Sequence, residues 1–447
     1  MSEVASLTAR FRESIDGLGA PSRVVVAVSG GLDSCVLLHL ARFHTGRSGI
    51  HWTAAHFDHA MRAGSADDAR WVAGLCRAWD VPLRAATADT PPSSEEEARE
   101  ARYAFLERVR DQLGADLVLT AHHADDQAET VLFRLLRGTG AKGLRGIPAR
   151  RSRWIARPLL DFWRAELEAY ACAVHLSWRE DPTNRDVAFA RNALRNRILP
   201  DVERLVAPGA RRSLVRLSDL AGEDEAAWRS VLPTLMSPLE VADVDGGVSF
   251  LREPFLALHP AVRARVVRSL ADRLGATLDR GATRRVVEFS ESGRSGRAID
   301  LGDSVTFGVE LERVVLARRL PVGEDRPLHI PDRSPGRGTV VLAGSSVPVS
   351  WGGRGVDDHS LVEDLEVDDP CFPLVVRSRR PGDRVRLPAG TKKVKKVLLE
   401  SRIPPSERHR IPLVVDAGGR VLWIPGLGRA AWDGREGRRS TLRIGIG

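Results

Sequence analysis

The chain has 447 residues, which is enough for two or three domains with cores of their own. It carries 67 Lys and Arg against 59 Asp and Glu, a net charge of +8 with a pI near 9.9, and this balance favours a polyanionic partner. Charged residues interrupt the N-terminal segment, and no run of about 18 apolar residues occurs, so a signal peptide and a membrane span are excluded and the cytoplasm is the expected location. The four cysteines are widely spaced without a Cys-x-x-Cys pair, which argues against zinc ribbons, iron–sulfur clusters and redox thiol pairs.

Strand and helix patterns alternate over the first 150 residues. This alternation predicts a parallel sheet with helices on both faces, an α/β fold whose ligands bind beyond the carboxyl ends of the strands. Ser94 is expected to cap one of the helices, with Glu97 completing a capping box. The predicted strands are 23–29, 51–58, 81–87 and 116–121.

The first predicted strand runs into the string Ser29-Gly30-Gly31-Leu32-Asp33-Ser34, and an apolar helix follows. Glycines let the backbone approach an anion, and the first N–H groups of a helix are free to donate to it. Asp33 adds a carboxylate suited to a phosphate-bound Mg²⁺. The string predicts a nucleotide-phosphate loop, and the alternative is an ordinary tight turn between strand and helix. It matches neither the Walker pattern nor Gly-x-Gly-x-x-Gly.

Polar residues also follow the second predicted strand. Asp58, His59 and Arg62 place an acid, an imidazole and a guanidinium in one loop at a strand end. The alternative is a polar surface loop in which Ser65 caps the next helix.

The fourth predicted strand is followed by His122-His123-Ala124-Asp125-Asp126, with Glu129 three residues further on. Asp126 and Glu129 share one face of the first helical turn, where acids also simply complement the helix dipole. A transition-metal site of His and Asp is a further alternative, disfavoured because no matching ligand cluster occurs elsewhere. The glycines and cations of 137–146 suit a mobile phosphate-contacting loop or a flexible linker. The helix itself is expected to bury Ala128, Val131, Leu132, Leu135 and Leu136.

Beyond residue 201 the pattern changes. Residues 202–320 are predicted to form a mostly helical domain that includes a strand at 305–311, and 321–338 reads as a linker. Residues 1–201, before this change, are predicted to form the catalytic domain. Residues 339–447, after the linker, are predicted to form a small α+β domain. Its strands are expected at 339–349, 374–377, 411–416 and 421–424.

The strongest local charge lies in the C-terminal domain. Residues 377–410 contain 12 Lys or Arg and 3 Asp or Glu, a net +9 that exceeds the charge of the whole chain. Such runs are either solvated faces or nucleic-acid contacts. Because no Phe, Tyr or Trp is interleaved, contact with RNA phosphates is expected here rather than base stacking.

The Ser29–Ser34 string resembles the pyrophosphate loop (PP-loop) of the N-type ATP pyrophosphatases, and further motifs narrow this resemblance to tRNA(Ile)-lysidine synthase. They cover about the first 200 residues and part of the C-terminal domain; the usual leucine before Arg62 is Met61 here. The motifs are Asp58-His59-x-x-Arg62-x-x-Ser65, Arg99-Glu100-Ala101-Arg102-Tyr103, Ala121-His122-His123-x-Asp125-Asp126-Gln127-x-Glu129-Thr130, Arg137-Gly138-Thr139-Gly140, Arg157-Pro158-Leu159-Leu160, Asp181-Pro182-Thr183-Asn184, Arg191-Asn192-x-x-Arg195, Arg380-Pro381-Gly382-Asp383-Arg384 and Lys392-Lys393-x-Lys395-Lys396.

The resemblance implies a ligase that uses ATP and Mg²⁺, with no iron–sulfur cluster and no zinc. ATP would adenylate the C2 oxygen of the wobble cytidine in an isoleucine tRNA with the anticodon CAU. Free L-lysine would then displace AMP and leave lysidine, so that the tRNA changes from methionine to isoleucine identity. The expected partners are this tRNA and lysine, with no membrane, and a homodimer is left open.

The resemblance also implies roles for individual residues. The middle domain would contact tRNA. Catalysis would involve Asp33, Arg102, His122, Asp126 and Glu129, with lysine bound by the last three and Mg²⁺ held by Asp33. ATP would contact Ser29, Gly30, Gly31, Leu32, Asp33, Ser34, Asp58 and Arg62. The tRNA would contact Arg137, Lys142, Arg191, Arg195, Arg380, Arg384, Lys392, Lys393, Lys395 and Lys396.

Three rival functions are weighed against the ligase. A PP-loop tRNA thiolase of the two-thiocytidine type would need Cys-x-x-Cys pairs, which this chain lacks. A non-catalytic tRNA-binding protein on the same fold is disfavoured by the presence of Asp33, His122, Asp126 and Glu129. An amidotransferase-type synthetase would need a glutaminase nucleophile, and no cysteine has suitable surroundings.

Overall fold

The computed structural model describes residues 3–447 except 46–48, 62–63, 181–189, 319–323, 354, 368–370, 389, 405–406 and 432–439. It divides into two compact units, Met1–Ser230 and Val231–Gly447. The division falls within helix α10 (Ala210–Met236), whereas the sequence pattern predicts a boundary after residue 201. The start of α10 stays with the first unit because Arg211 contacts Glu203 at 3.1 Å and Asp125 at 3.6 Å.

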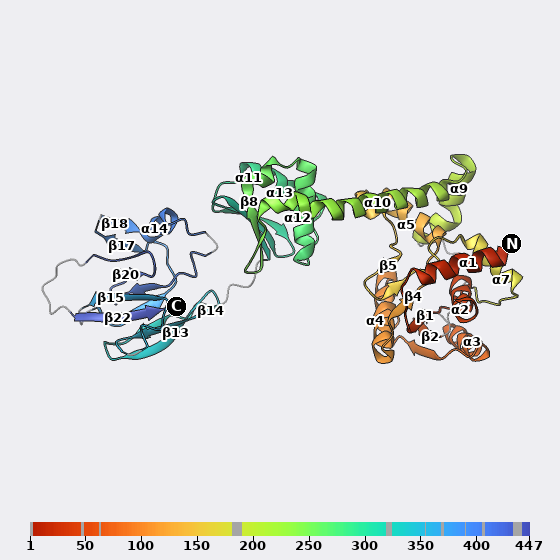
Figure 1. Ribbon diagram of the computed structural model, residues 1–447, viewed down its shortest axis with the longest axis horizontal. Coiled ribbons are helices and arrows are strands. Elements are labelled where there is room, and N and C mark those ends of the chain that lie inside the picture. Colours follow the sequence, from red (N-terminus) through yellow and green to blue (C-terminus); the bar gives the residue numbers. More distant parts are fainter. Residues whose placement is uncertain are drawn as a thin grey trace. The chain divides into compact units, whose positions relative to one another are not determined.

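A six-stranded sheet organises the first unit, in the order β3-β2-β1-β4-β6-β5 (Figure 1). Neighbouring strands are parallel except β5 and β6, so the predicted parallel sheet is confirmed. The short strands β4 and β6 leave the residues that follow them at the same edge as the loop after β1. The strands are β1 (Arg23–Ala27), β2 (His51–Asp58), β3 (Leu83–Thr87), β4 (Leu117–Leu119), β5 (Arg150–Arg151) and β6 (Ile155–Ala156).

Helices cover both faces of this sheet, and Figure 1 shows α2 and α4 on opposite sides of β1 and β2. Val24 and Val26 of β1 belong to the core beneath α1, α2 and α7, whereas Val25 packs with Phe105 and Val109 of α4. Successive strand residues point to opposite faces, which explains the unbroken apolar run in β1. The helices are α1 (Glu3–Asp16), α2 (Leu32–His44), α3 (Ser65–Ala78), α4 (Glu95–Leu113), α5 (Ala124–Leu136), α6 (Ala141–Leu144), α7 (Arg164–Ala173), α8 (Ala190–Ala193), the π-helical turn η2 (Leu194–Ile198) and α9 (Leu199–Leu205).

Ser94 caps α4 as predicted, because its hydroxyl accepts the N–H of Glu97 at 3.1 Å. The second half of the capping box differs, since the Glu97 carboxylate accepts the N–H of Ser93.

The apolar face predicted for α5 is only partly buried. Ala128 and Val131 are buried, but Leu135 is 47% exposed and Leu136 is 67% exposed. The prediction for the last turn was wrong because a helical apolar period identifies a face, not how far along the helix its neighbours reach.

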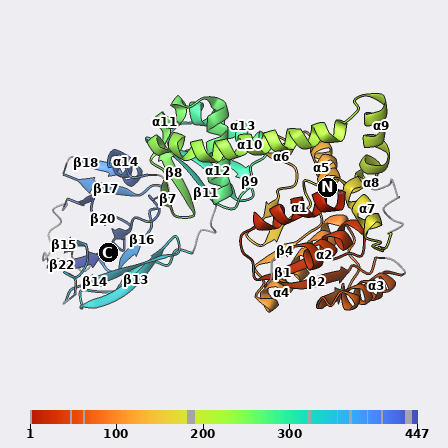
Figure 2. The same ribbon diagram turned by 45° about the vertical axis from the view of Figure 1, so that its right-hand side comes forward.

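The second unit begins with a helical region built on an antiparallel sheet, in the order β7-β8-β11-β10-β9 (Figure 2). The predicted strand at 305–311 is β10, whose Val305, Phe307 and Val309 are buried. The elements of this helical region are the 3-10 turn η3 (Ser237–Leu239), β7 (Ala242–Val244), β8 (Gly247–Leu251), α11 (Arg252–Ala257), α12 (Pro260–Arg273), α13 (Arg280–Ser292), β9 (Arg297–Gly302), β10 (Val305–Glu310) and β11 (Arg313–Arg318).

Two further sheets form the C-terminal region, in the orders β12-β16-β19-β20-β17-β18, with β21 paired to β20, and β13-β14-β22-β15. The predicted linker 321–338 instead contains β12 and the start of β13, and Ile330 within it is fully buried. The predicted strand 339–349 is a hairpin, because Ala343 and Gly344 take positive φ values and reverse the chain. The elements are β12 (Leu328–Ile330), β13 (Gly336–Leu342), β14 (Ser345–Trp351), β15 (Leu361–Val367), β16 (Leu374–Arg377), β17 (Arg384–Leu387), β18 (Gly390–Lys393), α14 (Val394–Glu400), β19 (Leu413–Val415), β20 (Val421–Ile424), β21 (Gly428–Arg429) and β22 (Ser440–Ile446).

Within the described ranges, no helix combines the length and the apolarity that a membrane crossing requires. Cys35, Cys76 and Cys371 are buried free thiols, and Cys172 is exposed.

Candidate active site

The loop between β1 and α2 is closed by hydrogen bonds among its own residues. The Ser34 hydroxyl donates to the Gly31 carbonyl at 2.9 Å and accepts the N–H of Ser29 at 3.1 Å. Gly30 has φ +93°, and a Cβ there would lie 3.2 Å from Val72, so glycine is needed at this turn. No side chain caps α2 at Gly31, which leaves its first amides for an anion.

Asp33, in the first turn of α2, has one engaged oxygen and one free oxygen. Oδ2 accepts a hydrogen bond from Nη1 of Arg164 at 3.1 Å. Oδ1 is buried and has no hydrogen-bond partner among the described residues. An unsatisfied carboxylate oxygen beside a phosphate loop fits Mg²⁺, which usually takes one or two carboxylates together with substrate phosphates. The described residues contain no cluster of three or more His, Cys, Asp or Glu that could hold a metal by itself.

His123, not assigned a role from the sequence, lies at the centre of the acidic groups. Its side chain is 1% exposed, and Nε2 lies 3.6 Å from Oδ2 of Asp33 and 3.6 Å from Oδ2 of Asp126. Burial alone would lower the pKa of His123, but the carboxylates of Asp126, Asp33 and Asp125 raise it above its ordinary value. His123 therefore joins the loop after β1 to helix α5 in one site.

Asp126 and Glu129 are paired with two arginines from a distant part of the chain. Oδ1 of Asp126 accepts from Arg191 at 3.1 Å and from Arg195 at 2.9 Å. Oε2 of Glu129 accepts from the same arginines at 3.2 and 3.1 Å. Burial alone would raise the pKa of Asp126, but His123 and Arg191 hold it well below its usual range, so the carboxylate stays ionised. Arg191 and Arg195, which are predicted to contact tRNA, thus bind the two acids that are predicted to contact lysine.

His122 lies beside this cluster and is held neutral. Burial lowers the pKa of His122 to about 3; Asp126 opposes this shift, and Arg157 and Arg102 add to it. Its Nδ1 lies 3.0 Å from the Thr120 hydroxyl.

The neutral state of His122 predicts a loss of stability in mild acid. The unfolded chain binds a proton at His122 near pH 6.5 and the folded protein only near pH 3, so stability is complete above pH 6.5 and falls as the pH drops below it. His122→Asn should remove this dependence and flatten the decline between pH 7 and pH 5, by about 2 kcal/mol at pH 5. Denaturant unfolding at both pH values measures the difference, and equal declines in both proteins would contradict it.

Asp58 closes the loop after β2. Its Oδ1 accepts the N–H of Ala60 at 2.8 Å, and Oδ2 accepts the Ser65 hydroxyl at 3.1 Å. Gly64, not Ser65, is the N-cap of α3, so the capping alternative for Ser65 was wrong. Contact of Asp58 with ATP stays a prediction, and Arg62 lies outside the described residues.

The positive charge of Arg102, on α4, helps to lower the pKa of His122, in the loop after β4, and of His59, in the loop after β2. Arg102 therefore lies near both loops. Burial is the larger cause at both histidines. This position is consistent with its predicted role near the transferred phosphate, which stays a prediction.

The glycine-rich segment after α5 is firmly held. The Gln127 amide donates to the carbonyls of Arg145 and Ile147 at 3.2 and 3.1 Å, and Arg134 donates to Gly143 and Gly146 at 2.9 and 2.8 Å. These contacts tie the segment to α5, and its predicted contact with a phosphate stays a prediction. The predicted tRNA contacts here, Arg137 and Lys142, are both exposed.

Comparison with known proteins identifies the family to which the chain belongs. The PP-loop domain family matches residues 5–202, and the family described as TilS substrate C-terminal domain matches residues 374–444. The tRNA(Ile)-lysidine synthase of Geobacillus kaustophilus is 32% identical over 94% of this chain and 94% of its own length. The chain belongs to the tRNA(Ile)-lysidine synthase family. The Symbiobacterium thermophilum member is 33% identical over 95% of this chain and 94% of its own.

Among solved structures, the U34-tRNA thiolase NcsA from Methanococcus maripaludis with its [4Fe-4S] cluster is 17% identical. The match covers 49% of this chain and 80% of the thiolase with a TM-score of 0.43.

The basic run of the family's C-terminal domain is only partly available to a ligand. Arg377 is buried and forms an ion pair with Asp383 at 2.8 Å. Glu400 contacts Lys392 at 2.8 Å and Lys396 at 3.9 Å. Four of the C-terminal cations predicted to contact tRNA are exposed and have no ion pair among the described residues: Arg380, Arg384, Lys393 and Lys395.

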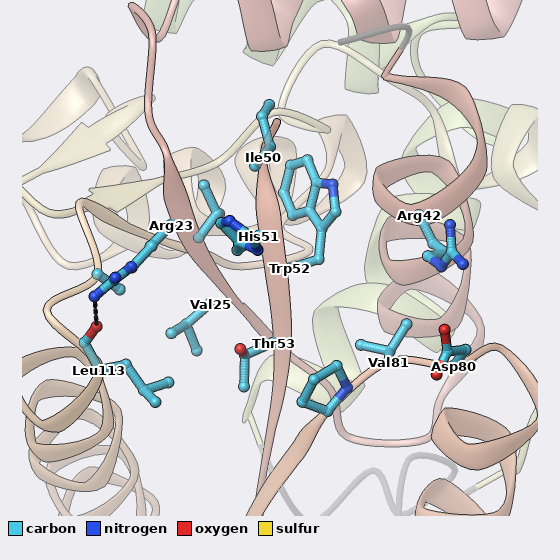
Figure 3. Close-up of a pocket in the computed structure, with 13 residues that line it drawn as sticks. Arg23, Val25, Arg42, Ile50, His51, Trp52, Thr53, Asp80, Val81 and Leu113 are labelled. Carbon is cyan, nitrogen blue, oxygen red and sulfur yellow. Dashed lines mark hydrogen bonds between the residues drawn. The ribbon is translucent and has the colours of Figure 1, made fainter. Parts of the chain in front are cut away.

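A cavity of about 500 Å³ lies at the amino ends of β1 and β2 (Figure 3). Its arginines already donate to backbone, Arg23 to the Leu113 carbonyl at 3.1 Å and Arg42 to the Trp79 carbonyl at 3.0 Å. Because the phosphate loop follows the opposite end of β1, this cavity is not part of the candidate site.

Proposed function

We propose that the protein is a tRNA(Ile)-lysidine synthase. It uses ATP to adenylate the C2 oxygen of the wobble cytidine in the CAU anticodon of tRNA(Ile), and free L-lysine then displaces AMP. The observation that carries the proposal is the contact chain from Asp33 through His123 to Asp126, which joins the phosphate loop and the acidic helix α5 in a family member. Such a reaction belongs in the cytoplasm.

In the first step the C2 oxygen bonds to the α-phosphorus of ATP as the bond to diphosphate breaks. The first amides of α2, which no side chain caps, would stabilise the growing charge of the departing diphosphate. Asp33 would hold Mg²⁺ through its free Oδ1, and the ion would neutralise the phosphates. Arg164, missed in the sequence, fixes the other oxygen of Asp33 and so orients the carboxylate.

In the second step an amine of lysine bonds to C2, the C2–O bond breaks, and AMP leaves with the oxygen. Asp126 is the carboxylate better placed to meet the lysine, since its side chain is 12% exposed against 2% for Glu129. Among the described residues, Oδ2 of Asp126 accepts one hydrogen bond, from the backbone N–H of His123, and has capacity for another donor, so an ammonium group can join without displacing an arginine. Glu129 then serves to hold Arg191 and Arg195.

The amine must lose a proton before it attacks. His122, whose pKa is lowered to about 3, is neutral at physiological pH, and a neutral imidazole next to Asp126 can take part in the transfer of that proton.

The C-terminal domain is expected to contact tRNA through Lys393 and Lys395, which are exposed and have no ion pair among the described residues. Lys393→Ala combined with Lys395→Ala should raise the KM for tRNA about 10-fold near 0.15 M salt and flatten the salt dependence of binding by roughly one unit or more of log–log slope. Lys392→Ala is the matched control, because Glu400 already pairs with that lysine. A double variant with unchanged tRNA affinity would remove this surface from the RNA interface.

The function is tested with ATP, labelled lysine and a CAU-anticodon tRNA(Ile) transcript. Transfer of label into the RNA with release of AMP is expected, and a methionine tRNA should not be labelled. Release of AMP without labelling would keep the phosphate loop and contradict the lysine assignment.

A further inference from the structure

A group of arginines from two parts of the first unit surrounds Tyr103 of α4. The guanidinium carbons of Arg99, Arg102 and Arg151 lie 5.5, 5.6 and 4.7 Å from the centre of the Tyr103 ring. Arg157, which follows β6, donates from Nη2 to the Tyr103 hydroxyl at 3.4 Å. We call these four arginines and Tyr103 the Tyr103 cluster.

Three arginines of this cluster lack an ion-pair partner among the described residues. In the part of the chain that the structure describes, no carboxylate forms an ion pair with Arg99, Arg151 or Arg157. Arg157 is 3% exposed, and its Nε is buried without a hydrogen-bond partner. Burial lowers the pKa of Arg157, the hydrogen bond and charge interaction with Tyr103 oppose this shift, and the neighbouring charges of Arg99 and Arg151 add to it. Like charges gathered at a partly buried place are costly unless an anion joins them.

The position of the cluster indicates which anion it receives. Arg151 belongs to β5, the edge strand of the sheet, whereas the phosphate loop follows β1, with β4 and β6 between them. Arg99 and Arg151 are exposed, so the ligand reaches them from solvent. Arg102 and Arg157 also act on His122, so the same cluster borders the candidate active site. A strand of RNA whose target base enters the site would carry its backbone over this surface.

We propose that the Tyr103 cluster binds a backbone phosphate of the tRNA next to the target cytidine. Arg99 and Arg151 lie against the Tyr103 ring and are exposed, so their guanidinium groups can donate to phosphate oxygens. The inference rests on the proposed function, since it names a phosphate contact of the same substrate. The phosphates of ATP share this chemistry, and the experiment separates the two sources.

The test is the double variant Arg99→Gln with Arg151→Gln, both exposed positions that should fold normally. Binding of tRNA(Ile) is measured without ATP or lysine, followed by steady-state KM values for tRNA and for ATP. The tRNA affinity should fall about 10-fold at 0.15 M salt with a flatter salt dependence, and the KM for ATP should stay within twofold. Arg108→Gln, an exposed arginine of α4 without a contact to Tyr103, is the matched control.

Phosphate ethylation interference locates the contact. With the wild-type protein, ethylation of one anticodon-loop phosphate should block binding, and the double variant should be indifferent to it. An unchanged tRNA affinity, or a rise confined to the KM for ATP, would overturn the proposal. Lysidine formation by the wild-type protein in the same assay reports separately on the proposed function, so the two can fail independently.

Discussion

Asp33→Asn is expected to lower the rate of AMP release by at least about 100-fold and to leave the fold intact. The substitution keeps one oxygen that can accept from Arg164 and removes the charge beside the phosphate loop. Because Oδ1 has no hydrogen bond to lose, the melting temperature should stay within about 2 °C of wild type. Release of AMP from labelled ATP in the presence of tRNA measures the effect.

Asp67→Asn is the matched control for that variant. Asp67 lies on α3, is exposed, and pairs among the described residues with the exposed Arg70, so its loss should change neither turnover nor stability appreciably. If Asp33→Asn retained more than about a tenth of wild-type AMP release, the carboxylate would have no part in the adenylation step.

The parts of the site that depend on local sequence were predictable. The turn at Gly30, the uncapped start of α2 and the acids of α5 follow from residues within one strand–loop–helix unit. The parallel sheet then brings such units together at one edge, because its strands run the same way.

The contacts between distant segments were not predictable from patterns. Arg164 reaches Asp33 across 131 positions of sequence, and Arg195 reaches Glu129 across 66. The family resemblance assigns Arg195 to tRNA, and the packing of η2 against α5 shows that the carboxylate of Glu129 contacts it. The adjacent His122 and His123 are alike in sequence, yet His123 turns toward three carboxylates and is 1% exposed.

Asp126→Asn is expected to raise the KM for lysine by at least about 10-fold while the KM for ATP changes less than threefold. Asparagine keeps an oxygen that can accept from Arg191 and Arg195, but it lacks the charge that attracts an ammonium group. Since the pKa of Asp126 is held well below its usual range, the wild-type KM for lysine should not rise between pH 8 and pH 5.5 through titration of this group. Lysine incorporation at varied lysine and saturating ATP and tRNA measures both effects, and Asp201→Asn, an exposed acid paired with Arg204, is the control.

Glu129→Gln separates a lysine contact from a structural role at the same cluster. Its carboxylate is 2% exposed and bonds both arginines, so its loss should lower the free energy of unfolding by roughly 3 kcal/mol, the low end for breaking a buried pair because Asp126 still contacts both arginines. Denaturant unfolding measures this loss, and the KM for lysine should change less than in Asp126→Asn. The reverse pattern, a stable Glu129→Gln protein with the larger rise in KM, would assign the lysine to Glu129, and an unchanged KM in both variants would exclude this cluster as the lysine site.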